Sequence, residues 1–223
     1  MYETTKTKKL WSELERSILT GKGIDIGCGP DPIFPDVCGF DKQSGDANEI
    51  TQYVHEQFDF VFSSHCLEHM NDPREAIQEW WKLVRPGGHL FFIVPDEDLY
   101  EQGVFPSRFN DDHKATFTIS KTKSWSPVSI NILDLVKSLP GSQLVNVALQ
   151  DEGYDRRRLK HTSRSLTGLW ARRVYGKCFC SNGGSSGKLG LARKTLLRFV
   201  DDQTLGPAAV AQIQCIVKKV ESA

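Results

Sequence analysis

The chain has 223 residues, of which 39% are hydrophobic and 25% are charged. It is long enough to bury a core without metal or disulfide cross-links, and its composition excludes overall disorder. Residues 1–9 are polar and the longest apolar run is short, so neither a signal peptide nor a membrane-spanning helix is expected. We expect a cytoplasmic protein whose six cysteines are buried or free thiols.

The 28 basic and 28 acidic residues cancel over the whole chain but not along it. Residues 156–200 contain twelve lysines or arginines and no aspartate or glutamate, so the remainder is acidic. We interpret residues 151–205 as a basic insertion or lid within a single domain that spans residues 1–223. This segment could bind phosphate groups, or it could be a solvated surface.

The first elements are one helix and two strands. Residues 8–19 have the apolar spacing of an amphipathic helix, which Gly21 ends. Residues 23–26 and 37–41 are short apolar runs typical of buried strands. Three prolines between these two strands exclude a regular helix of useful length there.

A strand, a helix and a strand follow in the middle of the chain. Residues 58–63 are apolar and predict the first of these strands. Asp72 can cap a helix that begins at Pro73 and stops at Pro86. Residues 89–94 are almost continuously apolar, which indicates a mostly parallel sheet covered on both faces.

The last part of the chain begins with a long loop. Residues 95–123 are rich in Asp, Phe and Pro, and loops of this length usually carry function. A helix is predicted over residues 126–139, and strands over residues 143–149 and 211–220 complete the sheet.

The sharpest motif is GIDIGCGP at residues 23–30. A buried strand that ends in Gly-x-Gly lets the backbone turn tightly and exposes its amide groups to a ligand. Asp25 lies inside this strand, so its carboxylate must have hydrogen-bond donors nearby. Asp41 ends the next strand, where a carboxylate can accept both hydroxyls of a ribose. Asp46 follows where an adenine amino group could donate to it.

These motifs, with FDFVFSSHCLEH at residues 58–69 and LVRPGG at residues 83–88, resemble the class I S-adenosylmethionine-dependent methyltransferases. The resemblance is greatest to small-molecule enzymes near the ubiquinone and menaquinone methyltransferases. It implies S-adenosylmethionine as cofactor and a Rossmann-like α/β fold. The implied sheet has seven strands, mostly parallel, with an antiparallel last strand and helices on both faces. Pro30 replaces the family's third glycine, so loop amides would hold the cofactor carboxylate.

The same resemblance implies eight cofactor-binding residues. They are Asp25, Gly27, Cys28 and Gly29 around the methionine part, Asp41 at the ribose, Asp46 and Ala47 at the adenine, and Ser63 beside the sulfonium.

Histidines are the candidate catalytic groups, because an alcohol acceptor needs a base and His titrates near neutral pH. We expect His113 to act, oriented by Asp112 or its neighbour Asp111, and His65 is the second candidate. No metal site is expected, because Asp111, Asp112 and His113 are too close in sequence to form a full one. Glu68 and the following histidine are interpreted as capping and packing groups at the entry to a helix.

The loop at residues 94–114 looks like that of methyltransferases encoded beside surface-polysaccharide enzymes, which points to a hydroxyl on a sugar or a sugar-linked molecule. The basic segment fits an anionic acceptor, since Arg binds phosphate esters bidentately. The candidate acceptor-binding residues are Asp96, Arg108, Lys114 and Arg157.

Two other functions remain open. The basic segment contains aromatic residues and could bind RNA, which would make the protein an RNA methyltransferase. Alternatively, the chain could be a non-enzymatic cofactor-binding or interaction protein. Zinc at Cys178, Cys180 and His161 is disfavoured because the cysteines lack the usual two-residue gap.

Overall fold

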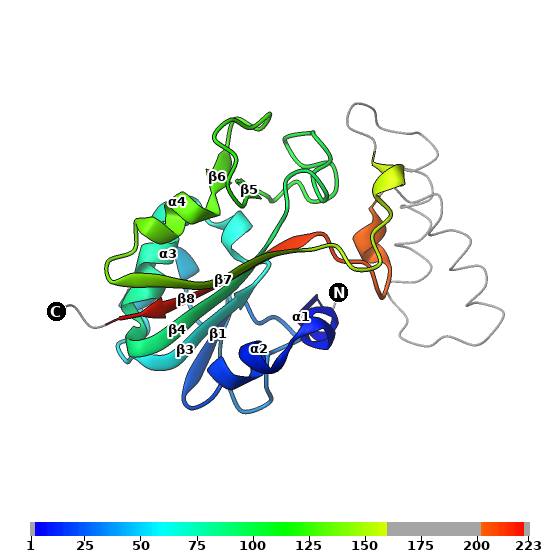
Figure 1. Ribbon diagram of the computed structural model, residues 1–223. Helices are drawn as coiled ribbons and strands as arrows, with labels where there is room; N and C mark the ends of the chain where they lie inside the picture. The colour runs from blue at the N-terminus through cyan, green and yellow to red at the C-terminus, as the bar shows by residue number, and fades with distance from the viewer. Residues whose placement is uncertain (1–2, 160–201, 221–223) are drawn as a thin grey trace.

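The computed structural model describes residues 3–159 and 202–220. Its centre is a sheet of six strands in the order β2-β1-β3-β4-β8-β7 (Figure 1). These strands are β1 (Gly23–Ile26), β2 (Cys38–Phe40), β3 (Phe58–Ser64), β4 (Val84–Pro95), β7 (Ser142–Gln150) and β8 (Gln212–Lys219). The first four are mutually parallel, and β8 runs antiparallel to both β4 and β7. The α/β fold, the mostly parallel sheet and the antiparallel last strand are thus confirmed.

The six strands expected from the apolar runs are present, but the seven-stranded sheet implied by the resemblance is wrong. The short link between β2 and β3 forms a 3₁₀ segment, η2 (Ala47–Gln52), instead of a helix and a further strand. Asp46 caps this segment by accepting from the Asn48 amide. The Trp80 indole donates to the Ala47 carbonyl at 2.8 Å. This contact holds η2 against the helix that begins at Pro73.

Helices cover both faces of the sheet, as expected (Figure 1). On one face lie α3 (Pro73–Lys82) and α4 (Ile132–Lys137). On the other lie α1 (Glu3–Thr7), the 3₁₀ segment η1 (Lys8–Leu10) and α2 (Glu13–Ile18). Alternate strand residues supply the two cores: Val61 packs towards α3, and Phe62 packs with the aromatic residues on the α2 side. The central strands β3, β4 and β8 therefore contribute to both hydrophobic layers.

Two predicted helices differ in their bounds. The single helix expected over residues 8–19 is interrupted, because Ser12 starts a new helix with a capping box completed by Glu15. The helix expected over residues 126–139 begins only at Ile132. The residues before it form β6 (Ser129–Asn131), which pairs with β5 (Thr116–Thr118) inside the expected long loop.

Three further 3₁₀ turns are η3 (Leu67–His69), η4 (Arg156–Arg158) and η5 (Gln203–Leu205). Most of the predicted basic lid, and the disfavoured zinc ligands Cys178, Cys180 and His161, lie outside the described residues. Within them, Cys28, Cys38, Cys66 and Cys215 are free thiols, as expected. No helix among the described residues is long and apolar enough to cross a membrane.

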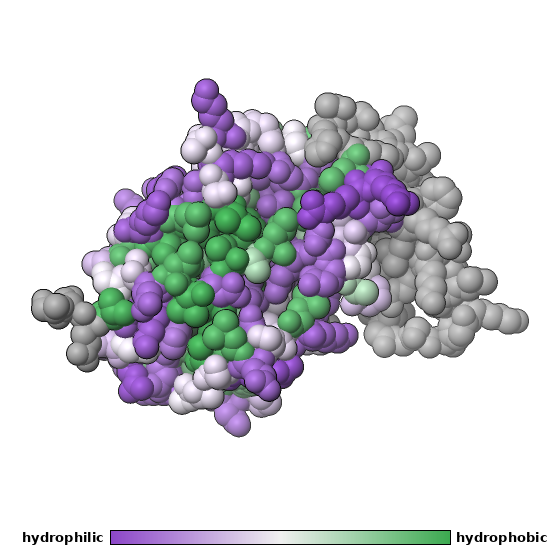
Figure 2. Space-filling model, in the orientation of Figure 1, coloured by the Kyte–Doolittle hydropathy of each residue, from purple (hydrophilic) through white to green (hydrophobic). Residues whose placement is uncertain are grey.

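One face of the molecule carries hydrophobic side chains in the region of β7 (Figure 2). The exposed apolar residues of this strand are Leu144, Val145 and Leu149. It is an edge strand, paired on one side only, with β8.

Candidate active site

A pocket of about 360 Å³ lies at the carboxyl ends of the parallel strands. Its walls are the loop after β1 (residues 27–31), the end of β3 with η3, and the loop after β4. Residues 3–4, η5 and the start of β8 close the remaining side. Ligands of open α/β sheets bind outside the carboxyl ends of the strands. The fold therefore places this pocket where a binding site is expected.

The glycine loop forms one wall. Gly27 has φ +75°, and a Cβ there would lie 2.6 Å from the Cys66 side chain, so only glycine fits. Gly29 has φ +50°, yet the nearest atom to a Cβ at this position is Asp41 Oδ2, 4.0 Å away. Space is thus open between the Gly29 backbone and the Asp41 carboxylate. A side chain at position 29 would fill this cradle.

Asp25 supports the loop from inside the sheet. Its carboxylate is almost completely buried and accepts the Ile33 amide at 2.7 Å. Burial raises the pKa of Asp25 to about 7, and the hydrogen bond from Ile33 only partly offsets this effect. Asp25 therefore holds the glycine loop in place, and its side chain does not line the pocket.

The other expected cofactor residues divide between the pocket and its surroundings. Cys28 lines the pocket beside the two glycines. Asp41, Asp46 and Ala47 lie beyond the lining, where the Asp41 side chain accepts the Lys42 amide at 2.7 Å. Ser63 is buried and donates to the Ile26 carbonyl, so the serine that faces the pocket is its neighbour Ser64.

Glu68 is the centre of a cluster of buried polar side chains. It lies on η3 and is only 1% exposed. Its Oε1 is 3.4 Å from His65 Nδ1 and 4.0 Å from His113 Nε2. Burial raises the pKa of Glu68, but the hydrogen bond and the charge of His65 lower it by more, and the net shift is downward. Glu68 was expected to be a capping and packing group, and the structure also brings it into contact with two histidines of the pocket.

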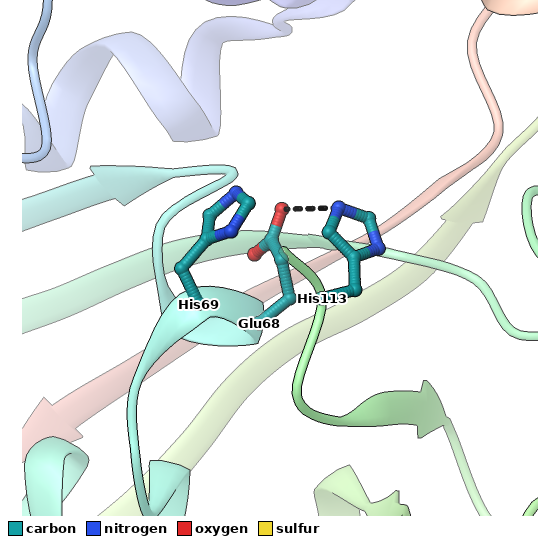
Figure 3. A group of neighbouring side chains, drawn as sticks. All are labelled: Glu68, His69 and His113. Carbon is teal, nitrogen blue, oxygen red and sulfur yellow. Dashed lines mark ion pairs between the residues drawn. The ribbon is translucent and has the colours of Figure 1, made fainter. Parts of the chain in front are cut away.

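His113 comes from the loop after β4 and is buried in the same cluster (Figure 3). The Lys114 amide donates to the Glu68 carbonyl, which ties this loop to η3. The imidazole stacks on Tyr100, with ring centroids 5.3 Å apart. Its Nδ1 is 2.6 Å from Glu101 Oε1. A carboxylate accepts this bond, so Nδ1 carries the proton and Nε2 faces Glu68.

His65 differs from His113 in having both ring nitrogens engaged with acceptors. It follows β3 with φ +54°, and its Nε2 is 2.9 Å from Gln212 Oε1. The Gln212 amide nitrogen donates to Thr7 and Gln150, which fixes its oxygen as the acceptor from His65. Burial lowers the pKa of His65, but Glu68 raises it more, and the net shift is upward. Glu68 thus stabilises the protonated form of His65.

Glu101 is the carboxylate that orients His113. Asp112, which was expected in this role, contacts His69 instead. The Asp112 backbone oxygen and its Oδ2 both lie 3.2 Å from His69 Nδ1. Asp111 and Asp112 are exposed. The sequence did not indicate Glu101, because this residue lies twelve positions before His113 and reaches the ring only through a turn of the loop.

Comparison with known proteins adds to this geometry. The sequence profile of a methyltransferase domain family matches residues 5–155. The chain belongs to this family. The expected resemblance to class I S-adenosylmethionine-dependent methyltransferases is confirmed at the level of the family. S-adenosylmethionine as the cofactor is confirmed at the same level.

The two proteins compared with the chain one by one share little sequence with it. The ubiquinone biosynthesis O-methyltransferase of Pseudomonas putida (strain GB-1) is 28% identical over 121 residues, which cover 41% of the chain and 52% of that protein. The chain thus matches about half the length of this curated relative. The phosphoethanolamine N-methyltransferase 2 of Haemonchus contortus, solved with phosphomonomethylethanolamine and S-adenosylhomocysteine, has the same fold. It gives a TM-score of 0.50 at 14% identity and covers 96% of the chain and 53% of the other protein.

The four expected acceptor-binding residues do not line the pocket. Asp96 is buried and accepts the amides of Asp98 and Leu99, and burial raises its pKa to about 6. Arg108 is buried and donates to Gln102 at 3.2 Å. Lys114 donates to an asparagine outside the pocket, and Arg157 is exposed on η4.

Proposed function

We propose that the protein transfers a methyl group from S-adenosylmethionine to a hydroxyl of a small, sugar-linked acceptor. The observation that carries this proposal is that one pocket is lined by both the glycine loop and the histidine–carboxylate cluster. Methyl transfer requires the nucleophile, the methyl carbon and the sulfur to be aligned in a site that excludes water. A shared pocket supports that arrangement.

The residues of the glycine loop fit the cofactor. The space between the Gly29 backbone and the Asp41 carboxylate is open to a ligand, because Gly29 has no Cβ to occupy it. Glu3 and Asp31 also line the pocket, and their carboxylates suit the positive charges of the cofactor. When bound, S-adenosylmethionine supplies a methyl group that is already activated for transfer. Gly27, Cys28 and Gly29 would hold its methionine part, and Asp41 its ribose.

His113 is the group best placed to activate the acceptor hydroxyl. Its Nδ1 donates to Glu101, which leaves the lone pair of Nε2 directed into the cluster beside the pocket. As a base, this nitrogen would take the hydroxyl proton. His65 is less suited to this role because Glu68 and Gln212 accept from both of its nitrogens. Tyr100 and Glu101 would keep the His113 ring in position.

The described lining favours a neutral hydroxyl at the reacting position. It contains the carboxylates Glu3, Asp31, Glu68 and Asp202, and none of its described residues is a lysine or arginine. A phosphate group on the acceptor would therefore need basic residues outside this described lining to bind it. The basic segment could supply them, but residues 160–201 are outside the described chain.

The test is a transfer assay with methyl-labelled S-adenosylmethionine against neutral glycosides, nucleotide sugars, phospho-sugars and an RNA pool. We expect label on a sugar-linked hydroxyl, and a loss of about 100-fold or more in His113→Ala. His55→Ala, at an exposed histidine outside the pocket, is the control and should retain full activity. Labelled RNA alone would favour the nucleic-acid alternative. Binding of the cofactor without transfer to any acceptor would favour a non-enzymatic role.

A further inference from the structure

Three side chains place potential metal ligands close together at the wall of the pocket (Figure 3). Glu68, His69 and His113 each offer one ligand atom, and all three atoms lie within 4.8 Å of one another. All three residues also line the pocket. Glu68 and His69 are adjacent on η3, and His113 comes from the loop after β4. The fold therefore assembles a set of ligands that the sequence separates by more than forty positions.

Hydrogen bonding inside the cluster is incomplete. Glu68 Oε2 is buried and has no hydrogen-bond partner. His113 Nδ1 donates to Glu101, so its Nε2 presents a lone pair to Glu68 Oε1, 4.0 Å away. In this tautomer no proton lies between His113 Nε2 and Glu68 Oε1. Among the described residues, Oε1 accepts only from His65, and Oε2 has no donor at all. An unsatisfied arrangement of this kind is costly unless a positive ligand occupies it.

The outer nitrogens of both histidines are held by acidic residues. His113 Nδ1 is 2.6 Å from Glu101, and His69 Nδ1 is 3.2 Å from Asp112 Oδ2. Histidines that bind metals almost always donate their other ring nitrogen to a carboxylate, a carbonyl or water, which fixes the ring and its tautomer. Both rings show this pattern, which in His113 leaves Nε2, the nitrogen that faces Glu68, available to a metal.

We infer that Glu68, His69 and His113 bind a divalent transition-metal ion at the wall of the pocket. Two imidazoles and one carboxylate suit Zn²⁺, Mn²⁺ or Fe²⁺ better than Mg²⁺, which prefers oxygen ligands. Three protein ligands leave coordination positions open, as in catalytic rather than structural sites. His65 is not a ligand: it donates to Glu68 and positions this carboxylate.

An open position on the ion would suit the oxygen of an acceptor hydroxyl. This part of the inference rests on the proposed function, whereas binding of the ion does not. A bound ion makes a hydroxyl easier to deprotonate by acting as a Lewis acid. With the ion in place, Nε2 of His113 is a ligand and the ion replaces it as the activating group, so the hydroxyl proton would pass to water. The oxygen then forms its bond to the methyl carbon as the carbon–sulfur bond breaks, and S-adenosylhomocysteine leaves.

The test uses the full chain, freed of metal by a chelator and titrated with CoCl₂ while visible absorption is recorded. We expect one Co²⁺ per chain with d–d bands of nitrogen and oxygen coordination. Glu68→Gln and His113→Ala remove ligands and should abolish these bands. Asp112→Asn, at an exposed side chain, should weaken binding about 10- to 100-fold. His55→Ala and Glu49→Gln are exposed controls and should bind as the wild type does.

The inference is overturned if the wild type gives no such bands, or if Glu68→Gln and Asp112→Asn bind Co²⁺ as tightly as the two controls. Either outcome would mean that Glu68, His69 and His113 do not form a metal site. Titration of the same samples with S-adenosylhomocysteine separates the two proposals. Co²⁺ binding without S-adenosylhomocysteine binding would reject the proposed function and leave the metal site supported.

Discussion

Asp25 shows how one buried carboxylate shapes the candidate site. It lies in β1, accepts the Ile33 amide and so holds the glycine loop. Burial raises its pKa to about 7, Lys8 lowers it, and the charges of Asp31 and Asp41 raise it further. In the unfolded chain, an aspartate ionises near pH 4. The stability that Asp25 contributes is therefore complete below about pH 4 and is lost as the pH rises through about 7.

Asp25→Asn should remove this pH dependence, because an amide stays neutral and its oxygen can still accept from Ile33. Between pH 5 and pH 8, we expect the unfolding free energy of the variant to rise relative to the wild type by up to roughly 3 kcal/mol. Denaturant unfolding at the two pH values measures this change. Asp36→Asn, at an exposed carboxylate, is the control. An equal change in both variants would show that Asp25 is not the group responsible.

Sequence reasoning at this scale found some residues of the site and missed others. The Gly-x-Gly motif and His113 were predicted, because glycines at a strand end and a histidine in a long loop are visible as patterns. Glu101 was missed, since its contact with His113 depends on the path of the loop. Glu68 was interpreted as a capping and packing group because the sequence does not show that His65 and His113 converge on it.

At the scale of elements, η2 takes the place where the resemblance implied a further strand. The Trp80 side chain is fully buried, and its indole donates to the Ala47 carbonyl. Trp80→Phe would leave this carbonyl without its donor and open a small cavity. We expect the unfolding free energy to fall by about 2 kcal/mol.

Trp125→Phe is the matched control, because the Trp125 side chain is 38% exposed and also donates its indole hydrogen, to Asp98. Its effect should stay within about 0.5 kcal/mol. Thermal or denaturant unfolding of the two variants compares them directly. Equal falls in the unfolding free energy would mean that the buried Trp80 side chain and its bond to Ala47 stabilise the fold no more than the exposed Trp125 side chain does.

The elements that sequence predicted best are those with strong local signals. The helix after Asp72 has a cap, a first-turn proline and an apolar face, and α3 begins at Pro73 as predicted. The N-terminal helix was predicted as one piece because its apolar spacing continues across Ser12, whereas the capping box with Glu15 starts α2 anew. The β5–β6 pair was missed because three-residue strands leave almost no periodic pattern.

At the scale of the whole molecule, five separate segments build one pocket. The glycine loop, the end of β3 with η3, the loop after β4, the N-terminal residues and the region around η5 meet there. Parallel strands bring the first three together, because their carboxyl ends share one edge of the sheet. The other two could not be predicted, since their positions depend on tertiary packing. One such contact is the bond from Lys6 Nζ to the Thr204 carbonyl.

The most direct test of the account is calorimetric titration of S-adenosylhomocysteine into the wild type, Gly29→Ala and Gly87→Ala. Both glycines have positive φ, so both substitutions strain the backbone. A Cβ at Gly29 enters the cradle facing Asp41, whereas a Cβ at Gly87 meets no atom within 4 Å. The account predicts binding by the wild type and Gly87→Ala, and at least about 10-fold weaker binding by Gly29→Ala. No binding by the folded wild type, or equal binding by all three, would contradict it.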